Sequence, residues 1–305
     1  MARGKQIIKK ISKSTSECLE LFIKHCEVKN LTFRTINNYR FECQHFIEWH
    51  GKEKGIDDIT PCTIEEYISY LQSKDISQTY LATKVRQLRA FFYFCMEREY
   101  MNKFSVKIPK ADEVIKEPYT QEELERLIKK PTTSSWVEWR NWAMVNYFLA
   151  TGNRLSTVIN IKIEDIDFAN NLIKLNILKT RKQQYIPMSS GLKDVLKTYL
   201  ELWEHNDNDY LFPEYEGKQL SARGAQWAIR KYNISRDVTK TSVHLFRHTY
   251  AKYYIVAGGE ATHLQRLLGH STLAMTNHYI NLYATDLQRN YDKFNPLDNI
   301  TRELA

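Results

Sequence analysis

Apolar residues recur at helical spacing in four segments of the first hundred residues. These segments are 16–28, 32–49, one that opens at Thr60 and Pro61, and 77–100. In the second segment the apolar positions lie three or four residues apart, as one face of an α-helix requires; they are Phe33, Ile36, Tyr39, Cys43, Phe46 and Ile47. Four such helices with short links predict an all-α bundle over residues 14–108.

A linker and a second set of elements follow the bundle. The helical period lapses over 109–118, a stretch with a proline at each end, which is typical of a connection between domains. Thr120 and Glu123 have the spacing of a capping box, so a second domain is expected over 119–305. Its next helices are expected at 136–149, 191–204 and 221–231.

Residues 161–188 change to the period of β-strands. Alternating apolar positions predict strands at 161–168, 172–178 and 183–188. Asn170 and Asn171 supply one turn, and 179–182 supplies the tip of a hairpin. The chain is therefore expected to be mainly α-helical, with a small β-sheet or hairpin in its C-terminal domain.

A helical pattern from about residue 243 places two polar residues on one face. His244 and Arg247 are three apart, and the apolar positions between and after them are Phe246, Tyr250, Tyr253 and Tyr254. A pair of glycines at 258–259 ends this helix, and 260–268 is expected to form the next one. A short third helix from Ser271 is expected to carry Tyr279.

The residue types gathered here suit a phosphodiester. A guanidinium keeps its charge and donates two hydrogen bonds in one plane, which matches the phosphate oxygens. A tyrosine can attack phosphorus as a nucleophile, and a histidine can exchange the protons that this attack requires. His244, Arg247, His270 and Tyr279 therefore form a candidate catalytic group.

Charge and cysteine content narrow the classes of protein further. The net charge is +8, and residues 1–110 hold 19 Lys and Arg against 13 Asp and Glu, so a polyanionic partner is favoured. Five cysteines, an odd number, include no C-x-x-C pair, and neither a disulfide framework nor a zinc site is indicated. We expect no cofactor and no metal. Without a signal peptide or a long apolar run, the protein is expected to be soluble, with no membrane partner.

The motifs H-x-x-R-H-T from His244 and L-G-H-S around His270, with Tyr279 nine residues after that histidine, resemble the signature of tyrosine site-specific recombinases. That family includes phage integrases, Xer resolvases and transposon integrases. The resemblance implies a two-domain DNA clamp, with a helical core-binding domain and an α+β catalytic domain. It implies metal-independent cutting and rejoining of DNA through a 3′-phosphotyrosyl link and a Holliday junction, for integration, excision or resolution of a mobile element or replicon.

The resemblance also implies roles for single residues. Arg154, in a Thr-Gly-x-Arg turn, and Arg247 would clamp the phosphate, although the glutamate usual three residues after the first arginine is Thr157 here. His244 would be the base, and His270 would donate to the phosphate or share in proton transfer. Tyr279 would be the nucleophile, with Tyr283, one helical turn later, as its positional alternative.

The expected hairpin tip carries three basic residues. Lys179 precedes Pro187 by eight residues, and by this register it resembles the active-site lysine that protonates the leaving 5′-oxygen. Arg181 and Lys182 are its alternatives and are expected to contact backbone phosphates. The polar faces of the N-terminal helices carry basic residues that either form a solvated surface or contact further phosphates. They are Arg34, Arg40, Lys84, Arg86 and Arg89.

The resemblance finally implies an assembly. Double-stranded DNA with a specific recombination site would be the substrate, bound by a homotetramer on two sites. The tail 284–305 would dock either on its own domain or on a neighbouring protomer. Segment 1–13 has five basic residues and no acidic one, which indicates either a frayed tail or an arm that binds phosphates. The expected location is the cytoplasm, at the nucleoid. Two alternatives are a strand transferase related to type IB topoisomerases and a non-catalytic DNA-binding relative.

Overall fold

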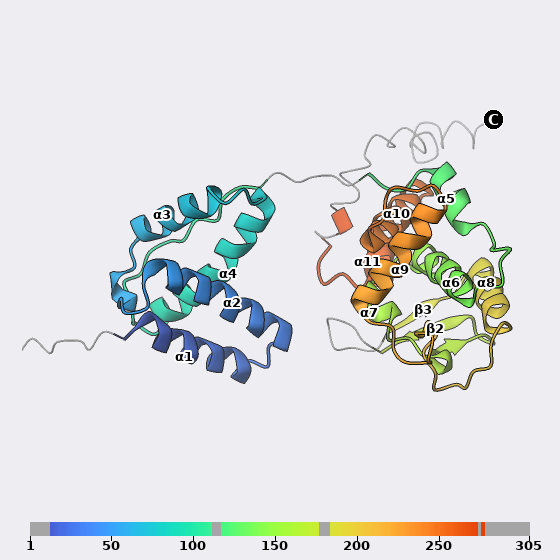
Figure 1. The fold of residues 1–305 in the computed structure, drawn as a ribbon, viewed down its shortest axis with the longest axis horizontal. Helices are drawn as coiled ribbons and strands as arrows, with labels where there is room; N and C mark the ends of the chain where they lie inside the picture. The colour runs from blue at the N-terminus through green and yellow to red at the C-terminus, as the bar shows by residue number, and fades with distance from the viewer. Residues whose placement is uncertain (1–12, 112–116, 177–183, 274–275, 278–305) are drawn as a thin grey trace, which may run out of the picture. The chain divides into compact units, whose positions relative to one another are not determined.

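The structure is a computed structural model, and it describes residues 13–111, 117–176, 184–273 and 276–277. The chain divides into two compact units, Met1–Val114 and Ile115–Ala305 (Figure 1). The division falls inside the expected linker at 109–118. The predicted fold class, mainly α with one small sheet, is confirmed.

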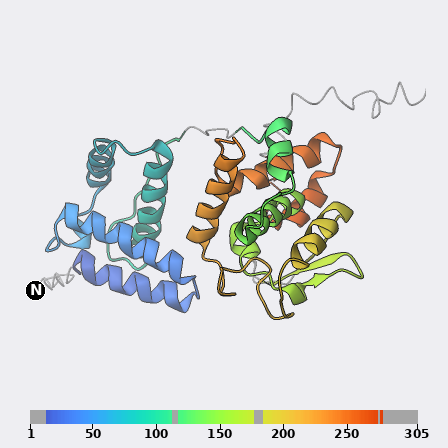
Figure 2. The ribbon, with the colours of Figure 1, turned by 45° about the vertical axis from the view of Figure 1, so that its right-hand side comes forward.

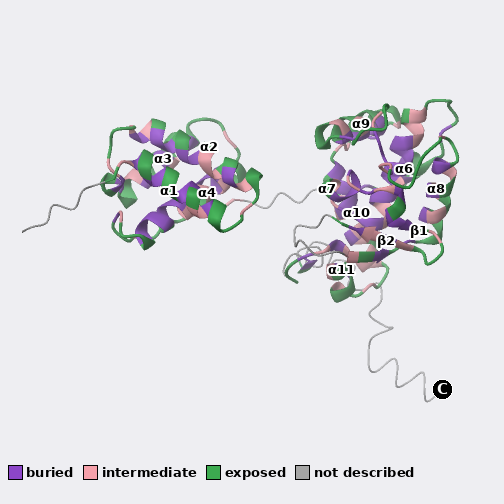
Figure 3. Ribbon diagram, turned by 90° about the horizontal axis from the view of Figure 1, so that it is seen from below, coloured by how far each residue is buried: buried purple, intermediate pink, exposed green. Residues whose placement is uncertain are grey.

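Over residues 13–111 the N-terminal unit contains four α-helices, and the helical spacing in the sequence predicted all four. They are α1 (Thr15–Val28), α2 (Phe33–His50), α3 (Pro61–Gln72) and α4 (Gln78–Glu97), with a 3₁₀ turn η1 (Ile56–Asp58) before α3. Each α-helix begins at a hydroxyl side chain that accepts a backbone N–H, as N-caps do; these are Ser14, Thr32, Thr60 and Ser77. Buried residues lie on one side of each helix and exposed residues on the other (Figure 3).

Two side chains expected on apolar faces of helices differ from the prediction. Phe33 is 79% exposed because it is the first residue of α2, before the packed turns begin. Tyr253 is exposed as well, since Tyr250 and Tyr254, four residues apart, take the packed side of their helix.

The C-terminal unit is built around one buried helix. The helices are α5 (Gln121–Ile128), α6 (Trp136–Thr151), α7 (Leu155–Val158), α8 (Ser190–Leu200), α9 (Ala222–Ser235), α10 (Val243–Val256) and α11 (Ala261–Leu268). α6 runs through the middle of the unit and packs against α5, α8, α9 and α10 (Figures 1 and 2). Compared with the prediction, α8 ends earlier, and α6 and α9 continue further.

A three-stranded antiparallel sheet in the order β1-β2-β3 completes this unit. The strands are β1 (Ile166–Asp167), β2 (Leu172–Leu175) and β3 (Gln184–Pro187). The first strand is much shorter than predicted, because residues Ile163–Asp165 form a 3₁₀ turn, η2, closed by the Asp165 carboxylate on the backbone N–H of Lys162. Asn171 makes the predicted turn with a φ of 55°. The tip at 179–182 lies outside the described residues.

Within the described ranges, no helix has both the length and the apolar character that a membrane crossing needs.

Candidate active site

A glycine turn at the end of α6 brings the first arginine of the site into place. Gly152 ends the helix with a φ of 61°, in the left-handed region. A Cβ at this position would lie 2.6 Å from Cδ1 of Tyr250 and 2.8 Å from Cδ2 of Leu268. Only glycine fits, because both the backbone angle and the contact exclude a side chain. The turn then directs Arg154 toward the end of α11.

Arg247 lies at the centre of the site and is 3% exposed. Its Nη1 donates to the carbonyl oxygen of Gly152 at 2.9 Å, and its Nη2 donates to the carbonyl oxygen of Leu268 at 2.8 Å. Gly152 is the C-cap of α6, and Leu268 is the last residue of α11. Backbone carbonyls at the C-terminal end of a helix have no hydrogen-bond partner within the helix, so they are available to the guanidinium. Neutral carbonyls fix the guanidinium without cancelling its charge.

Arg154 reaches the same helix end as Arg247. Its Nη1 donates to the carbonyl oxygens of Leu268 and Gly269, each at 3.4 Å. The two arginines therefore share the Leu268 carbonyl, although they come from segments almost a hundred residues apart. Thr157, which stands where the family usually has glutamate, is buried in the next turn. In this chain the carbonyls at the end of α11 hold Arg154.

His270 follows directly and is also buried, at 8% exposure. Its Nδ1 lies 2.9 Å from Oγ1 of Thr276. Burial is the largest cause that lowers the pKa of His270, and together with the charges of Arg247, Arg154 and His244 it brings this pKa to about 4. At neutral pH the imidazole is therefore uncharged, and it offers one donor and one acceptor nitrogen.

His244 lies in the first turn of α10, one turn before Arg247, and its side chain is exposed. Its ring meets that of His248 edge to face, with 5.1 Å between the centroids. The structure thus gathers four of the six predicted catalytic residues, Arg154, His244, Arg247 and His270. The other two, Lys179 and Tyr279, lie outside the described residues, as do Arg181, Lys182 and Tyr283.

The basic residues of the N-terminal unit have unequal surroundings. Arg34 and Arg86 are exposed. Arg40 forms an ion pair with Glu20 at 3.0 Å, and the guanidinium of Arg89 lies over the ring of Tyr93. Those four can present charge to a ligand.

Lys84 corrects the prediction of a solvated, phosphate-binding side chain. It is 8% exposed, and its Nζ donates to Oε2 of Glu42 at 2.6 Å. Lys84 lies between Leu81 and Leu88 on the face of α4 that packs against α2, where Glu42 is its buried partner. An ion pair of this kind holds two helices in register and leaves little charge for a ligand.

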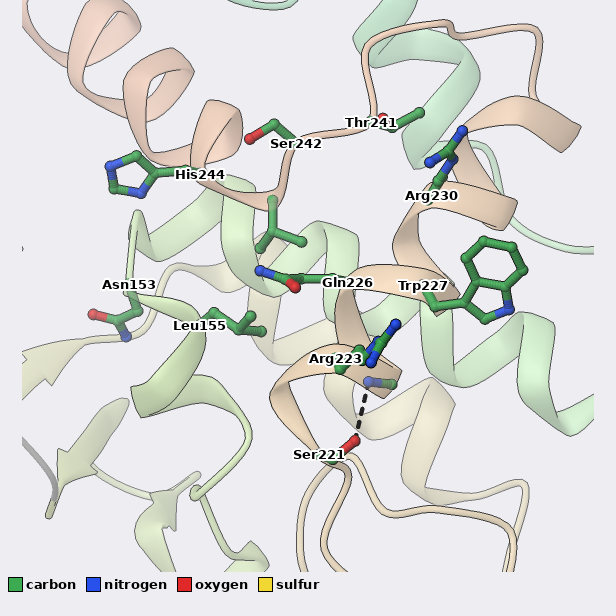
Figure 4. Close-up of a pocket in the computed structure, with 12 residues that line it drawn as sticks. Asn153, Leu155, Ser221, Arg223, Gln226, Trp227, Arg230, Thr241, Ser242 and His244 are labelled. Carbon is green, nitrogen blue, oxygen red and sulfur yellow. Dashed lines mark hydrogen bonds between the residues drawn. The ribbon is translucent and has the colours of Figure 1, made fainter. Parts of the chain in front are cut away.

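An open pocket of about 980 Å³ lies beside His244, and the sequence interpretation missed its residues. Exposed side chains of α9 line it: Arg223, Gln226, Trp227 and Arg230. Figure 4 shows His244 on one side, Trp227 and Arg230 on the other, and Gln226 between them. The signal was present in the sequence, because spacings of three and four residues put these polar and aromatic side chains on one helix face opposite buried Ala225 and Ile229.

Comparison with known proteins assigns both units. Residues 118–286 match the phage integrase family, and residues 18–102 match its N-terminal SAM-like domain. The tyrosine recombinase XerD of Staphylococcus saprophyticus is 27% identical over 291 residues, covering 91% of this chain and 98% of its own. XerC of Bacillus licheniformis is also 27% identical, over 91% of this chain and 96% of its own.

Solved structures agree with the fold. An integrase of the Tn1549 transposon, in complex with transposon right end DNA, aligns with a TM-score of 0.75 at 20% identity, over 88% of this chain and 94% of its own. A lambda integrase tetramer bound to a Holliday junction aligns with a TM-score of 0.71 at 16% identity, over 88% and 78%. The chain therefore belongs to the phage integrase family of tyrosine site-specific recombinases, the enzymes that cut and rejoin DNA.

Proposed function

We propose that this recombinase cleaves each DNA strand with Tyr279 and stabilises the transition state with Arg154 and Arg247. The observation that carries the proposal is the shared carbonyl of Leu268, which brings both guanidiniums to one place beside His270. Two fixed cations at one point suit a phosphodiester whose negative charge increases as a fifth oxygen approaches phosphorus. Each such donor typically contributes ~3 kcal/mol to transition-state stabilisation.

In the proposed reaction each phosphodiester bond that breaks is replaced by another, and each proton has a donor and an acceptor. The phenolate oxygen of Tyr279 attacks phosphorus, the bond to the 5′-oxygen breaks, and a 3′-phosphotyrosyl link forms. His244 takes the phenol proton, since it is exposed one helical turn before the buried Arg247. Neutral His270 donates a hydrogen bond to a phosphate oxygen, and Lys179 protonates the departing 5′-oxygen. Attack by a 5′-hydroxyl from the partner duplex reverses these steps and exchanges the strands.

The surface of α9 is proposed to read the DNA sequence. Arginine pairs with guanine and glutamine with adenine in the major groove, and an apolar side chain contacts the methyl group of thymine. Arg223, Gln226 and the 56% exposed Trp227 supply all three types next to His244. We propose Arg34, Arg40, Arg86 and Arg89, with Arg181 and Lys182, as contacts to the phosphate backbone, which position the protein without reading bases.

The active assembly is proposed to be a homotetramer on two double-stranded DNA sites. Support comes from the lambda integrase tetramer on a Holliday junction, whose fold this chain shares. We propose that the tail 284–305 docks on the neighbouring protomer, which closes a ring and couples the activity of adjacent subunits. The enzyme would then act at the nucleoid, in the cytoplasm.

A nicked suicide substrate tests the nucleophile. The wild-type chain should become covalently attached to the labelled strand, and Tyr279→Phe should abolish the adduct while Tyr283→Phe retains it. An adduct that disappears with Tyr283→Phe instead would refute the assignment. Resolution of a synthetic Holliday junction, measured against relaxation of supercoiled plasmid, separates a recombinase from a topoisomerase-like transferase.

A further inference from the structure

A buried hydrogen bond joins the second histidine of the site to the segment that leads to the nucleophile. Nδ1 of His270 and Oγ1 of Thr276 are 2.9 Å apart. Thr276 is fully buried, and its backbone N–H donates to the carbonyl oxygen of Leu273. Along the chain, Thr276 comes three residues before Tyr279.

The direction of this hydrogen bond determines which ring nitrogen of His270 carries the proton. A neutral imidazole carries its proton on one ring nitrogen, and the partner of the other nitrogen selects the tautomer. When the Thr276 hydroxyl donates to Nδ1, the proton stays on Nε2. A phosphate oxygen has only acceptor character, so Nε2–H is the form of His270 that can bind it.

We propose that Thr276 is a positioning residue that sets the Nε2–H tautomer of His270 through this buried contact. The proposal rests on the proposed function and deepens it.

Two substitutions separate this role from simple filling of space. Thr276→Ser keeps the hydroxyl and removes one methyl group, whereas Thr276→Val keeps the shape and removes the donor. In single-turnover cleavage of the nicked substrate by the full chain, the serine variant should stay within about threefold of wild type. The valine variant should lose about tenfold, as expected for one buried hydrogen bond.

A double-mutant cycle shows whether Thr276 acts through the histidine. In a His270→Ala background, Thr276→Val should cause no further loss of rate, since the group that it positions is gone. A further tenfold loss in that background would overturn the proposal. Equal rates for Thr276→Val and wild type would overturn it as well.

Nitrogen-15 spectra of histidine-labelled protein read the tautomer directly. The wild type and Thr276→Ser should show His270 protonated at Nε2, and Thr276→Val should shift the population toward Nδ1. A wild-type His270 protonated at Nδ1 would refute the proposal even if the valine variant failed to fold. Failure of the proposed function is a different result, namely the absence of any Tyr279-dependent adduct with wild type.

Discussion

Removal of the Lys84 ammonium should destabilise the N-terminal unit rather than weaken its hold on DNA. Lys84→Met leaves the carboxylate of Glu42, a side chain only 6% exposed, without its partner at 2.6 Å. Breaking a buried ion pair in this way costs about 3–5 kcal/mol. The ammonium also lies 4.7 Å from the centroid of the Tyr80 ring, and loss of that cation–π contact adds to the cost.

This loss in the free energy of unfolding is large for a domain of about 100 residues. A loss of 1 kcal/mol lowers the melting temperature of a domain of about 100 residues by roughly 4–8 °C, so Lys84→Met should lower it by at least about 12 °C. The double variant Lys84→Met/Glu42→Leu removes both charges and should recover most of this loss, because apolar replacement of a buried pair is often neutral.

Hydrogen exchange of the full chain locates the effect. Amides of α2 and α4 should lose protection in Lys84→Met, while those of α6 serve as the internal reference. Arg86→Met is the matched control, since Arg86 is exposed on the same helix, and its stability should stay within about 0.5 kcal/mol of wild type. Unchanged protection in Lys84→Met together with weaker DNA binding would refute the assignment of Lys84 as a structural residue.

Four further outcomes are expected. Gly152→Ala should lower both the free energy of unfolding and the rate of cleavage, because the added Cβ would clash with Tyr250. Gly217→Ala is the control: Gly217 has a similar φ of 77° but no neighbouring atoms, so this variant should cleave like wild type. Equal cleavage by the two variants would contradict the prediction. Because the pKa of His270 is lowered from 6.5 to about 4, stability should be full above pH 6.5 and fall as the pH drops toward 4. Chemical unfolding of His270→Gln should show a flatter pH dependence in that window, and an unchanged slope would refute the coupling. Cleavage should persist in excess EDTA, and strict dependence on Mg²⁺ would reject the arginine mechanism. Arg86→Gln should weaken binding to all DNA sequences and reduce the salt dependence, measured by titration at several salt concentrations; a loss confined to one sequence would mean that Arg86 reads bases.

Local sequence rules predicted most of the helices. Capping residues such as Thr120, which caps α5 with Glu123, and the apolar spacing within each segment are short-range signals, and they survive in the folded chain. The prediction of a long first strand was wrong because the carboxylate of Asp165 closes a 3₁₀ turn by accepting the backbone N–H of Lys162. The alternation of apolar residues alone does not reveal this hydrogen bond. Phe33 shows the same limit, since periodicity does not say where packing begins.

Long-range partners were beyond the reach of the sequence. Nothing near Lys84 along the chain identifies Glu42, 42 residues away, as its buried partner. The motif identified Arg154 and Arg247 but not the carbonyl of Leu268 that they share, because a backbone group has no residue type to recognise. The α9 face had a readable pattern, yet its importance appears only with His244 across the pocket.

The backbone carbonyls that hold the two arginines make the site resistant to mutation. Any residue at position 268 presents a carbonyl oxygen, so a substitution there cannot delete the acceptor, and it acts through the packing of this buried side chain instead. These carbonyl oxygens are also not protonated at acidic pH, so they continue to accept hydrogen bonds under conditions that would neutralise a carboxylate. Among the groups known to orient Arg247, Gly152 is therefore the vulnerable one, because its carbonyl depends on a backbone shape that other residues resist. Apolar replacements of similar size at the buried position 268 should accordingly be tolerated more readily than any replacement at position 152.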